Sequence, residues 1–318
     1  MTAPGARPGR RRCRALAAVV LAAAVLAGAC SPGGGDARDE RDTQEGAGDR
    51  TPAGGGDPLP AGGVRFVVVG DFGTGKAPQQ EVADAMCEHH AREPFDFIVS
   101  TGDNVYPDGE PEDFHDNFIE PYECLTDRGV RWHATLGNHD ASTDGGQPQI
   151  DDPAFGMPAS YYTWRLRPIS FVMLDSNELD NPEVEQIAWM EERLATARTA
   201  RWTVVVFHDP VYSAGQHGST PRFDTLLADR FEQLGVDLVL NGHDHLYARA
   251  HKDGIDYVVT GGGGAPIDEC LSSVPPEVSK CIPELHYTEV EAGPKELTVT
   301  AIAPDDRILD RFEIRPSS

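Results

Sequence analysis

The run FDFIVSTGDNVY at residues 95–106 decides the fold, because it passes directly from a continuous apolar segment into a Gly-Asp pair. Residues 95–99 have the composition of a buried strand, so Asp103 stands just beyond a strand end. At that position a side chain projects into the crevice above an open α/β sheet, where such sheets bind ligands. A carboxylate has two oxygens and can bridge two cations about 3.5 to 4 Å apart. We therefore predict that Asp103 binds two metal ions.

Tyr106 lies three residues after Asp103 and is an unusual metal ligand. A phenol has an ordinary pKa of about 10, so it binds as phenolate only beside a strongly polarising cation. Ferric iron is the biological cation that best meets this requirement. The alternative is that Asp103 caps a turn and Tyr106 packs in the core. This short run alone does not decide between the two.

Ligand-type residues follow four other predicted strands in the same way. They are Gly70-Asp71-Phe72-Gly73, Gly137-Asn138-His139-Asp140, His208-Asp209-Pro210 and Asn241-Gly242-His243-Asp244-His245. Asp, Asn and Gly also suit turns, which explains one such ending well but all five badly. His243 and His245 are two residues apart, so both can face one site only in a turn, which Gly242 permits. The pattern predicts a site built from several strand ends.

Apolar runs and helix-compatible segments alternate along the chain from residue 64 onwards. Strands are expected at 64–69, 95–99, 131–136, 169–174, 203–207, 236–240, 257–260, 297–302 and 308–314, and helices at 79–91, 183–197 and 223–234. This alternation predicts an α/β fold in which helices cover the sheets. The last strands have no helices between them, so we expect them to form a second, antiparallel-rich sheet. Residues 64–318 suit one large domain.

The first 29 residues have the pattern of an export signal. Arginines at positions 7, 10, 11, 12 and 14 precede apolar residues 15–26, which are too few to span a bilayer as a helix. The following LAGACS, residues 26–31, resembles a bacterial lipoprotein processing site, in which the cysteine, here Cys30, is lipidated. This predicts an exported protein anchored by lipid to the outer face of the cell membrane, with plain secretion as the alternative. Both Sec and twin-arginine export remain open.

Composition limits the other partners. Residues 30–63 contain almost no large apolar side chain, so we expect a flexible linker there. The formal net charge is −25, and no cluster of Lys and Arg occurs outside the first residues. Nucleic acid is therefore not expected as a partner, because binding to phosphate backbones needs a basic surface. The sequence does not indicate the oligomeric state.

Four cysteines remain in the predicted domain: Cys87, Cys124, Cys270 and Cys281. An exported protein tends to oxidise an even set of cysteines. Proximity in the sequence favours Cys270 with Cys281, and Cys87 with Cys124 between two helices. This is one of three connectivities.

Two glycine-rich segments need to be distinguished from nucleotide-binding loops. Residues 70–77, GDFGTGKA, have the spacing of a P-loop, but Ala77 replaces the Ser or Thr whose hydroxyl binds magnesium. No convincing acidic partner strand follows, so a nucleotide triphosphatase is disfavoured. The glycines at 261–264 lack a lysine, and we expect a tight turn that lets the backbone approach the metal site closely.

Taken in order, the motifs resemble the signature of purple acid phosphatases within the calcineurin-like metallophosphoesterases. The matching blocks are Asp71-x-Gly73, Gly102-Asp103-x-x-Tyr106, Gly137-Asn138-His139-Asp140, Val205-x-x-His208 and Gly242-His243-x-His245. Tyr106 separates the purple enzymes from other members, and the short domain resembles the small, mammalian-like tartrate-resistant form. The resemblance implies a four-layer α/β/β/α sandwich of two mixed sheets flanked by helices.

The resemblance also implies a ligand set for each metal ion. A ferric ion would be held by Asp71, Asp103, Tyr106 and His245, and a divalent iron, zinc or manganese ion by Asp103, Asn138, His208 and His243. The anionic ligands would leave the cluster with a charge of about +2, which matches a small dianionic phosphate monoester. Hydroxide formed at the metals would then attack phosphorus in line with the leaving group.

An acid must protonate the leaving group, and the resemblance points to His139 and His217. The alternatives are that His139 is a structural histidine behind the ligands and that His217 is a solvated loop residue. The neighbouring aspartates Asp140, Asp209 and Asp244 either orient imidazoles or belong to turns.

These candidate ligands and acids are compatible with three functions. The first is an exported phosphomonoesterase, an acid phosphatase active at acid to neutral pH. The second is a phosphodiesterase or nucleotide phosphohydrolase with the same site, and the third is a non-catalytic lipoprotein that binds phosphate or metal. A complete ligand set with candidate acids argues against the third.

His89 and His90 lie outside the motifs and are expected on an exposed, charged helix face.

Overall fold

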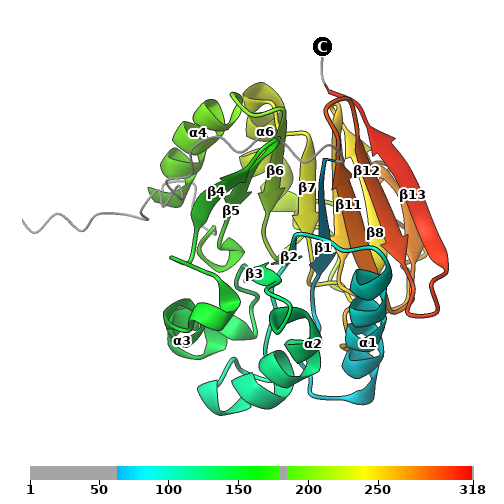
Figure 1. Ribbon diagram of the computed structural model, residues 1–318. Coiled ribbons are helices and arrows are strands. Elements are labelled where there is room, and N and C mark those ends of the chain that lie inside the picture. The colour runs from blue at the N-terminus through cyan, green and yellow to red at the C-terminus, as the bar shows by residue number, and fades with distance from the viewer. Residues whose placement is uncertain (1–62, 180–184, 317–318) are drawn as a thin grey trace, which may run out of the picture. The chain divides into compact units, whose positions relative to one another are not determined.

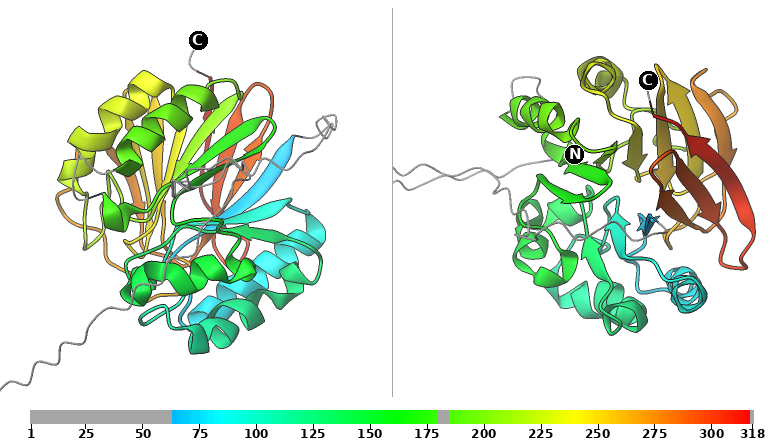
Figure 2. Two further views of the ribbon diagram at one scale, coloured as in Figure 1. Left: turned by 90° about the vertical axis from the view of Figure 1, so that its left-hand side faces the viewer. Right: turned by 45° about the horizontal axis from the view of Figure 1, so that its top comes forward.

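The computed structural model describes residues 63–179 and 185–316, which belong to one compact unit. The predicted signal at 1–29, Cys30 and the linker up to residue 62 lie outside the described residues. In the described part, two mixed sheets pack face to face and helices cover their outer faces (Figure 1). Figure 2 shows the same layers from two further directions. The predicted α/β/β/α fold class is confirmed.

The first sheet has six strands in the order β13-β12-β11-β1-β2-β3. Its parallel part consists of β1 (Val64–Val69), β2 (Phe97–Ser100) and β3 (Arg131–His133). On the other side of β1 lie the antiparallel strands β11 (Tyr287–Ala292), β12 (Leu297–Ile302) and β13 (Ile308–Ile314). The strand that precedes Asp71 is therefore central in its sheet.

The second sheet has seven strands in the order β10-β8-β9-β7-β6-β5-β4. Its parallel strands are β5 (Ile169–Met173), β6 (Trp202–Val206), β7 (Leu238–Asn241) and β9 (Ile255–Thr260). The antiparallel strands are β4 (Tyr162–Leu166), β8 (Tyr247–Lys252) and β10 (Val278–Ile282). The strands that precede the predicted histidine ligands, β6 and β7, are neighbours here.

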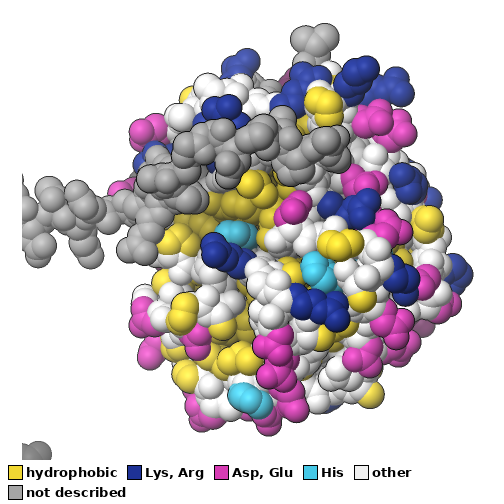
Figure 3. All heavy atoms as spheres, viewed as in Figure 1, with side chains coloured by type: hydrophobic (Ala, Val, Ile, Leu, Met, Phe, Trp, Pro, Cys, Tyr) yellow, Lys and Arg dark blue, Asp and Glu magenta, His cyan; other side chains and the backbone are white. Residues whose placement is uncertain are grey.

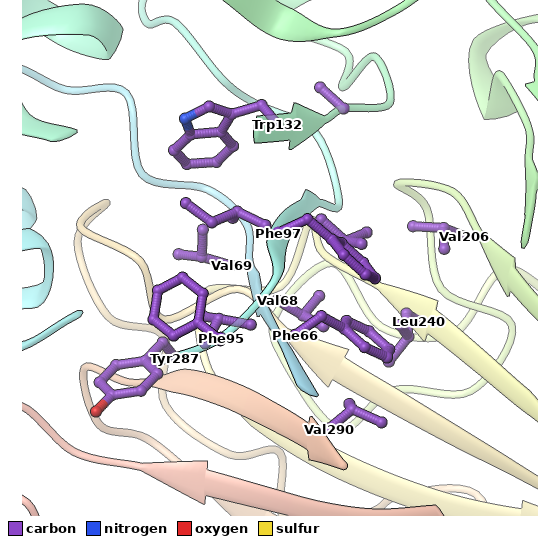
Figure 4. Close-up of a cluster of buried hydrophobic side chains, with 14 of the residues drawn as sticks. Phe66, Val68, Val69, Phe95, Phe97, Trp132, Val206, Leu240, Tyr287 and Val290 are labelled. Carbon is purple, nitrogen blue, oxygen red and sulfur yellow. The ribbon is translucent and has the colours of Figure 1, made fainter. Parts of the chain in front are cut away.

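Large apolar side chains from both sheets fill the space between them. Phe66 of β1 and Phe97 of β2 stack with ring centroids 5.0 Å apart, and both meet Phe171 of β5 edge-on, at 5.3 and 5.7 Å. Val206 and Leu240 face this cluster from the second sheet (Figure 4). Because the central strands are buried on both faces, they appear in the sequence as continuous apolar runs.

Helices protect the outer face of each sheet from water. On the side of the first sheet lie α1 (Ala77–Arg92), α2 (Glu123–Thr126) and α3 (Gln147–Asp151), and on the side of the second lie α4 (Glu185–Ala197), α5 (Pro221–Phe223) and α6 (Asp229–Leu234) (Figure 1). In α4, Ile187, Met190 and Leu194 are spaced by three and four residues and pack on the second sheet. None of the helices within the described ranges is both long and apolar enough to cross a membrane.

The expectation of a separate antiparallel sheet at the C-terminal end is wrong. β11, β12 and β13 join the first sheet beside β1, whereas β8 and β10 extend the second sheet beside β9. A strand edge carries unpaired N–H and C=O groups, and β1 satisfies those of one edge with β11, whereas β9 satisfies those of one edge with β8. Sequence patterns identify a strand but not the edge that it joins.

Two disulfides tie the outer parts of this unit. They join Cys87 of α1 to Cys124 of α2, and Cys270 to Cys281 of β10, each with Cα atoms 6.1 Å apart. This is the pairing that sequence proximity favours.

The exposed position expected for His89 is wrong. His89 is 8 % exposed, and its Nε2 atom lies 2.7 Å from Oε2 of Glu289 on β11. This face of α1 is buried against β11, and the Glu289 carboxylate satisfies the imidazole. His90 is half-buried, and its Nδ1 atom accepts a hydrogen bond from the N–H of Phe95 at 3.2 Å.

Candidate metal centre

All the predicted metal ligands follow strands that end at one edge of the two sheets. Asp71 follows β1, Asp103 and Tyr106 follow β2, Asn138 follows β3, His208 follows β6, and His243 and His245 follow β7. The strands β1 to β3 and the strands β6 and β7 belong to different sheets. The candidate site therefore lies where the two sheets meet.

Three of these residues adopt backbone conformations that are rare for residues other than glycine. The φ angles are 57° at Asp71, 53° at Asp103 and 72° at His243. Such strain costs about 1 to 3 kcal/mol per residue and concentrates at functional sites. Hydrogen bonds stabilise two of these backbone conformations. The N–H of Asp71 donates to Gly102 O at 3.0 Å, and the N–H of His243 donates to both carboxylate oxygens of Asp71 at 3.0 Å.

The four residues predicted to hold the ferric ion lie together. Oxygen and nitrogen atoms of Asp71, Asp103 and His245 lie within 4.8 Å of one another. The Tyr106 hydroxyl donates to Oδ2 of Asp103 at 2.9 Å and lies 3.3 Å from Nε2 of His245. The phenol is thus placed among the other candidate ligands rather than packed in the core.

The four residues predicted to hold the divalent ion also come together. Oδ1 of Asn138 lies 3.1 Å from Nε2 of His208 and 3.1 Å from Nδ1 of His243. Oδ2 of Asp103 lies 3.5 Å from Nε2 of His208. Asp103 therefore borders both groups of residues, as a bridging ligand must.

Hydrogen bonds fix which imidazole nitrogens face the site. Nδ1 of His208 donates to Thr101 O at 2.9 Å, and Nδ1 of His245 donates to Pro266 O at 2.9 Å. Carbonyl oxygens only accept, so Nε2 of each neutral ring presents a lone pair to the site. These lone pairs converge with the oxygens of Asp71 and Asp103. The donor set therefore fits cations.

The electrostatics of the site also fit bound cations. Burial raises the pKa of Asp71 well above its ordinary value. Burial and the charges of Asp71 and Asp103 raise the pKa of Tyr106 well above the ordinary value of a phenol. Burial lowers the pKa of His208, but Asp103 and Asp71 outweigh burial and raise it overall. A cation at this place would favour the ionised carboxylates and phenolate and the neutral imidazole.

Glycines allow the backbone to approach the ligands closely. A Cβ atom on Gly137 would lie 2.0 Å from Oδ1 of Asp103, and one on Gly261 would lie 2.8 Å from Oδ2 of Asp71. No larger residue fits at Gly137 without moving Asp103. The segment 261–264 brings its backbone against the site, since the N–H of Gly263 donates to Gly70 O at 3.1 Å, and the N–H of Ala265, which follows the segment, donates to Asp71 O at 2.8 Å.

The two predicted acids lie at the rim of this group of residues. The His139 ring centroid is 4.5 Å from that of Tyr106, and Nδ1 of His139 donates to Pro107 O at 2.5 Å. The exposed ring of His217 has its centroid 4.4 Å from that of His243. Both imidazoles thus stand beside candidate ligands, one on each side of the site.

The three aspartates that follow the motifs have different roles. Asp140 is buried and accepts hydrogen bonds from the backbone N–H groups of Asn104, Val105 and Gly137, so it anchors turns. Burial and the charge of Asp103 raise the pKa of Asp140 to about 6. Asp244 accepts from the N–H groups of His217 and Gly218, so it fixes the His217 loop through its backbone. Asp209 lies near an imidazole: its Oδ1 atom is 3.8 Å from Nε2 of His243.

Sequence reasoning missed several supporting groups. The buried side chain of Asn104 donates to Thr135 O at 2.8 Å and to Oε1 of Gln149 at 3.0 Å. Asp268 accepts from the N–H of His245 at 3.0 Å. Asn104 could have been noticed within the Gly-Asp-Asn run. Gln149 and Asp268 carry no signal in the sequence, because they lie outside the motifs, Gln149 in α3 and Asp268 in the segment between β9 and β10.

Comparison with known proteins agrees with this geometry. The model of a family described as calcineurin-like phosphoesterase matches residues 64–247, more than half of the chain. The chain belongs to the calcineurin-like phosphoesterase family. Within this family it is similar to human tartrate-resistant acid phosphatase type 5, with 30% identity over 297 residues that cover 77% of this chain and 89% of that protein. Purple acid phosphatase 17 of Arabidopsis thaliana is 29% identical over 231 residues, covering 64% of this chain and 68% of that protein. The resemblance to purple acid phosphatases is thus confirmed.

Solved structures of calcineurin-like phosphoesterases and related folds support the architecture. Purple acid phosphatase PPD1 from yellow lupin superposes with a TM-score of 0.69 at 19% identity, over 79% of this chain and 53% of that chain. GAP50, described as the anchor in the inner membrane complex of Plasmodium, gives a TM-score of 0.71 at 16% identity, over 80% of this chain and 89% of that chain. At these identities the likeness shows the fold alone.

Proposed function

We propose that this protein is an exported acid phosphatase that hydrolyses small phosphate monoesters at a centre of two metal ions. The proposal rests on one observation. Candidate ligands that follow strands of both sheets surround Asp103, and its carboxylate borders both ligand groups. The similarity to tartrate-resistant and purple acid phosphatases supports the same conclusion.

The donor sets suggest which ion each group would hold. Asp71, Asp103, Tyr106 and His245 offer mainly anionic oxygen, which suits a ferric ion, whereas Asn138, His208 and His243 with Asp103 suit divalent iron, zinc or manganese. When bound, the two ions would polarise the phosphoryl oxygens and supply an activated water as nucleophile.

The side chains of this protein would hold the substrate and move protons. Nδ1 of His139 donates to Pro107 O, which leaves Nε2 free of any bond to the described residues and open to the leaving group. His217 is exposed, and Asp244 holds its backbone in place. An acid at this rim would protonate the departing oxygen, which lowers the barrier most for leaving groups of high pKa.

We further propose that the protein is exported and attached by Cys30 to the outer face of the cell membrane. Support comes from the signal-like residues 1–29 and from the two disulfides, since disulfides persist in oxidising compartments. A Cys30→Ala variant tests the attachment. It is expected in the medium or the soluble extracellular fraction, whereas equal membrane partition of variant and wild type would contradict a lipid anchor.

The activity is tested by hydrolysis of an aryl phosphate monoester and the matching aryl phosphate diester by the metal-loaded full chain. We expect kcat/KM for the monoester to exceed that for the diester at least about tenfold, because a dianion matches the charge of the centre better. A reversed preference would replace the proposal by a phosphodiesterase. Metal binding without turnover of either ester would leave a binding protein.

A further inference from the structure

Asp209 places a partly exposed negative charge beside the candidate ligand His243. Ser176 Oγ donates to its Oδ2 atom at 2.6 Å, and the Asp209 N–H donates to Ser176 Oγ at 3.1 Å. One carboxylate oxygen is therefore fixed. The other, Oδ1, lies 3.8 Å from Nε2 of His243 and makes no hydrogen bond within the described residues. The side chain is 22% exposed, so a ligand can reach this oxygen.

Basic side chains do not balance this charge in the segments around the site. Residues 101–112, 137–146, 174–179, 207–219, 241–246 and 261–270 contain no Lys or Arg. Their acidic residues are Asp103, Asp108, Glu110, Glu112, Asp140, Asp144, Asp175, Glu178, Asp209, Asp244, Asp268 and Glu269. The segment after β1 adds one basic residue, Lys76, which is exposed at the N-cap of α1.

A second carboxylate lies beside the same ligands, because Asp268 accepts from the N–H of His245 at 3.0 Å. On the face shown in Figure 3, Asp and Glu side chains are spread over the upper, right-hand and lower parts, and Lys and Arg lie among them except near the bottom. The positive charge that attracts a phosphate ester would therefore come from the metals.

We infer that the site prefers phosphate monoesters whose alcohol carries a positive charge close to the phosphate, such as phosphorylated amino alcohols, and that Asp209 is the residue that recognises this charge. The inference rests on the proposed function, because the metals must hold the phosphate. With the phosphate at the centre, an ammonium group a few atoms away can reach Oδ1 of Asp209. Esters with further negative charges beside the phosphate are repelled by the acidic segments.

The test compares 2-aminoethyl phosphate with 2-hydroxyethyl phosphate, which differ in charge but hardly in size. We measure kcat/KM of the metal-loaded full chain at pH 7 for both substrates, in the wild type, in Asp209→Asn and in Glu296→Gln. Glu296 is an exposed residue of the turn between β11 and β12, at the opposite end of the sheet from Asp71. Its substitution changes the net charge equally and serves as the control.

We expect the wild type and Glu296→Gln to prefer the amino substrate about fivefold, as a partly exposed ion pair allows. In Asp209→Asn the preference falls to about one, and raising the salt concentration weakens the wild-type preference. A wild type without this preference would overturn the inference. So would equal losses for both substrates in Asp209→Asn, since Asp209 would then only position His243. Absence of turnover on these substrates and on an aryl phosphate would instead overturn the proposed function.

Discussion

Two buried polar clusters in the described part of the chain balance donors and acceptors in opposite ways. The carboxylate of Asp310 on β13 accepts from Tyr247 at 2.9 Å and from Lys280 at 2.7 Å, and Nε of Arg249 lies 3.1 Å away. Donors thus outnumber the carboxylate there. At the candidate metal centre, the Nε2 atoms of His208 and His245, which carry lone pairs, face carboxylate oxygens of Asp103 and Asp71 at 3.5 and 3.7 Å.

The difference separates a structural cluster from a functional one. In the Asp310 cluster the buried carboxylate is paired with protein donors and cations alone, and the cluster connects the first sheet to β8 and β10 of the second. The metal centre is complete only with cations, because imidazole lone pairs and carboxylate oxygens face one another there with no proton between them. Burial of charge by itself therefore does not identify a site. The imbalance between donors and acceptors does.

Substitution at the centre should affect activity most. Asp103→Asn removes the charge that borders both ligand groups, and we expect kcat to fall at least about a thousandfold because the metals supply both nucleophile and charge stabilisation. Steady-state hydrolysis of an aryl phosphate measures the loss, with circular dichroism as the control for folding. A variant with near wild-type kcat and full metal content would refute the bridging role of Asp103.

The matching change in the other cluster should affect stability and leave the chemistry intact. Asp310→Ala leaves Lys280 and Arg249 without their carboxylate, and we expect the free energy of unfolding to fall by about 3 kcal/mol. Denaturant titration measures this change. The kcat of the folded variant should equal that of the wild type, and a large loss of kcat would show that the two clusters are coupled.

His286 sharpens the comparison, because it is fully buried like His208 but its pKa moves in the opposite direction. Burial lowers the pKa of His286 to about 4. Its Nδ1 atom donates to Glu284 O at 2.9 Å, and its Nε2 atom lies 3.2 Å from the Thr260 hydroxyl, which satisfies a neutral ring. In the unfolded chain the pKa is about 6.5, so between these values the unfolded state binds more protons.

The stability contributed by neutral His286 is therefore fully present above about pH 6.5 and is lost as the pH falls towards 4, with a total of about 3 kcal/mol. Unfolding free energies at pH 7 and pH 4.5 measure the loss in the wild type and in His286→Gln. The variant should be less stable at pH 7 and should lose less stability on acidification. Equal losses in both proteins would contradict this assignment.

The smallest effect is expected at the rim of the centre. His217→Ala removes a candidate acid without changing any candidate ligand, and we expect kcat to fall about a hundredfold for alkyl phosphates and much less for nitrophenyl phosphate. A series of phosphate esters with leaving groups of increasing pKa measures the trend. Equal losses across the series would remove the role of His217 as the acid.

The sequence predicted the site better than the topology. Ligand-type residues after apolar strands indicated the five segments that form the site, because strand ends are defined by local patterns. The choice of the seven candidate ligands within these segments came from the resemblance to purple acid phosphatases. The sheet membership of β11, β12 and β13 could not be predicted in this way, since it depends on which strand edge remains open in the folded protein. The strand β10 is half-exposed at a sheet edge, and its apolar pattern is correspondingly weak.

Contacts between distant residues explain the other differences. His89 appeared exposed because its partner, Glu289, lies 200 residues further along the chain. The carbonyl groups of Thr101 and Pro266 that orient His208 and His245 belong to the backbone, and any residue type could supply them. Such support becomes visible only when the loops are placed in space.

The visible absorption spectrum of the purified, metal-loaded protein tests the central claim most directly, with Tyr106→Phe as the matched variant. We expect a band in the wild type that disappears in the variant, because phenolate bound to ferric iron absorbs visible light and phenylalanine cannot bind the metal. A colourless wild type that is metal-loaded and active would contradict it. The centre would then hold two metals without a bond between Tyr106 and ferric iron.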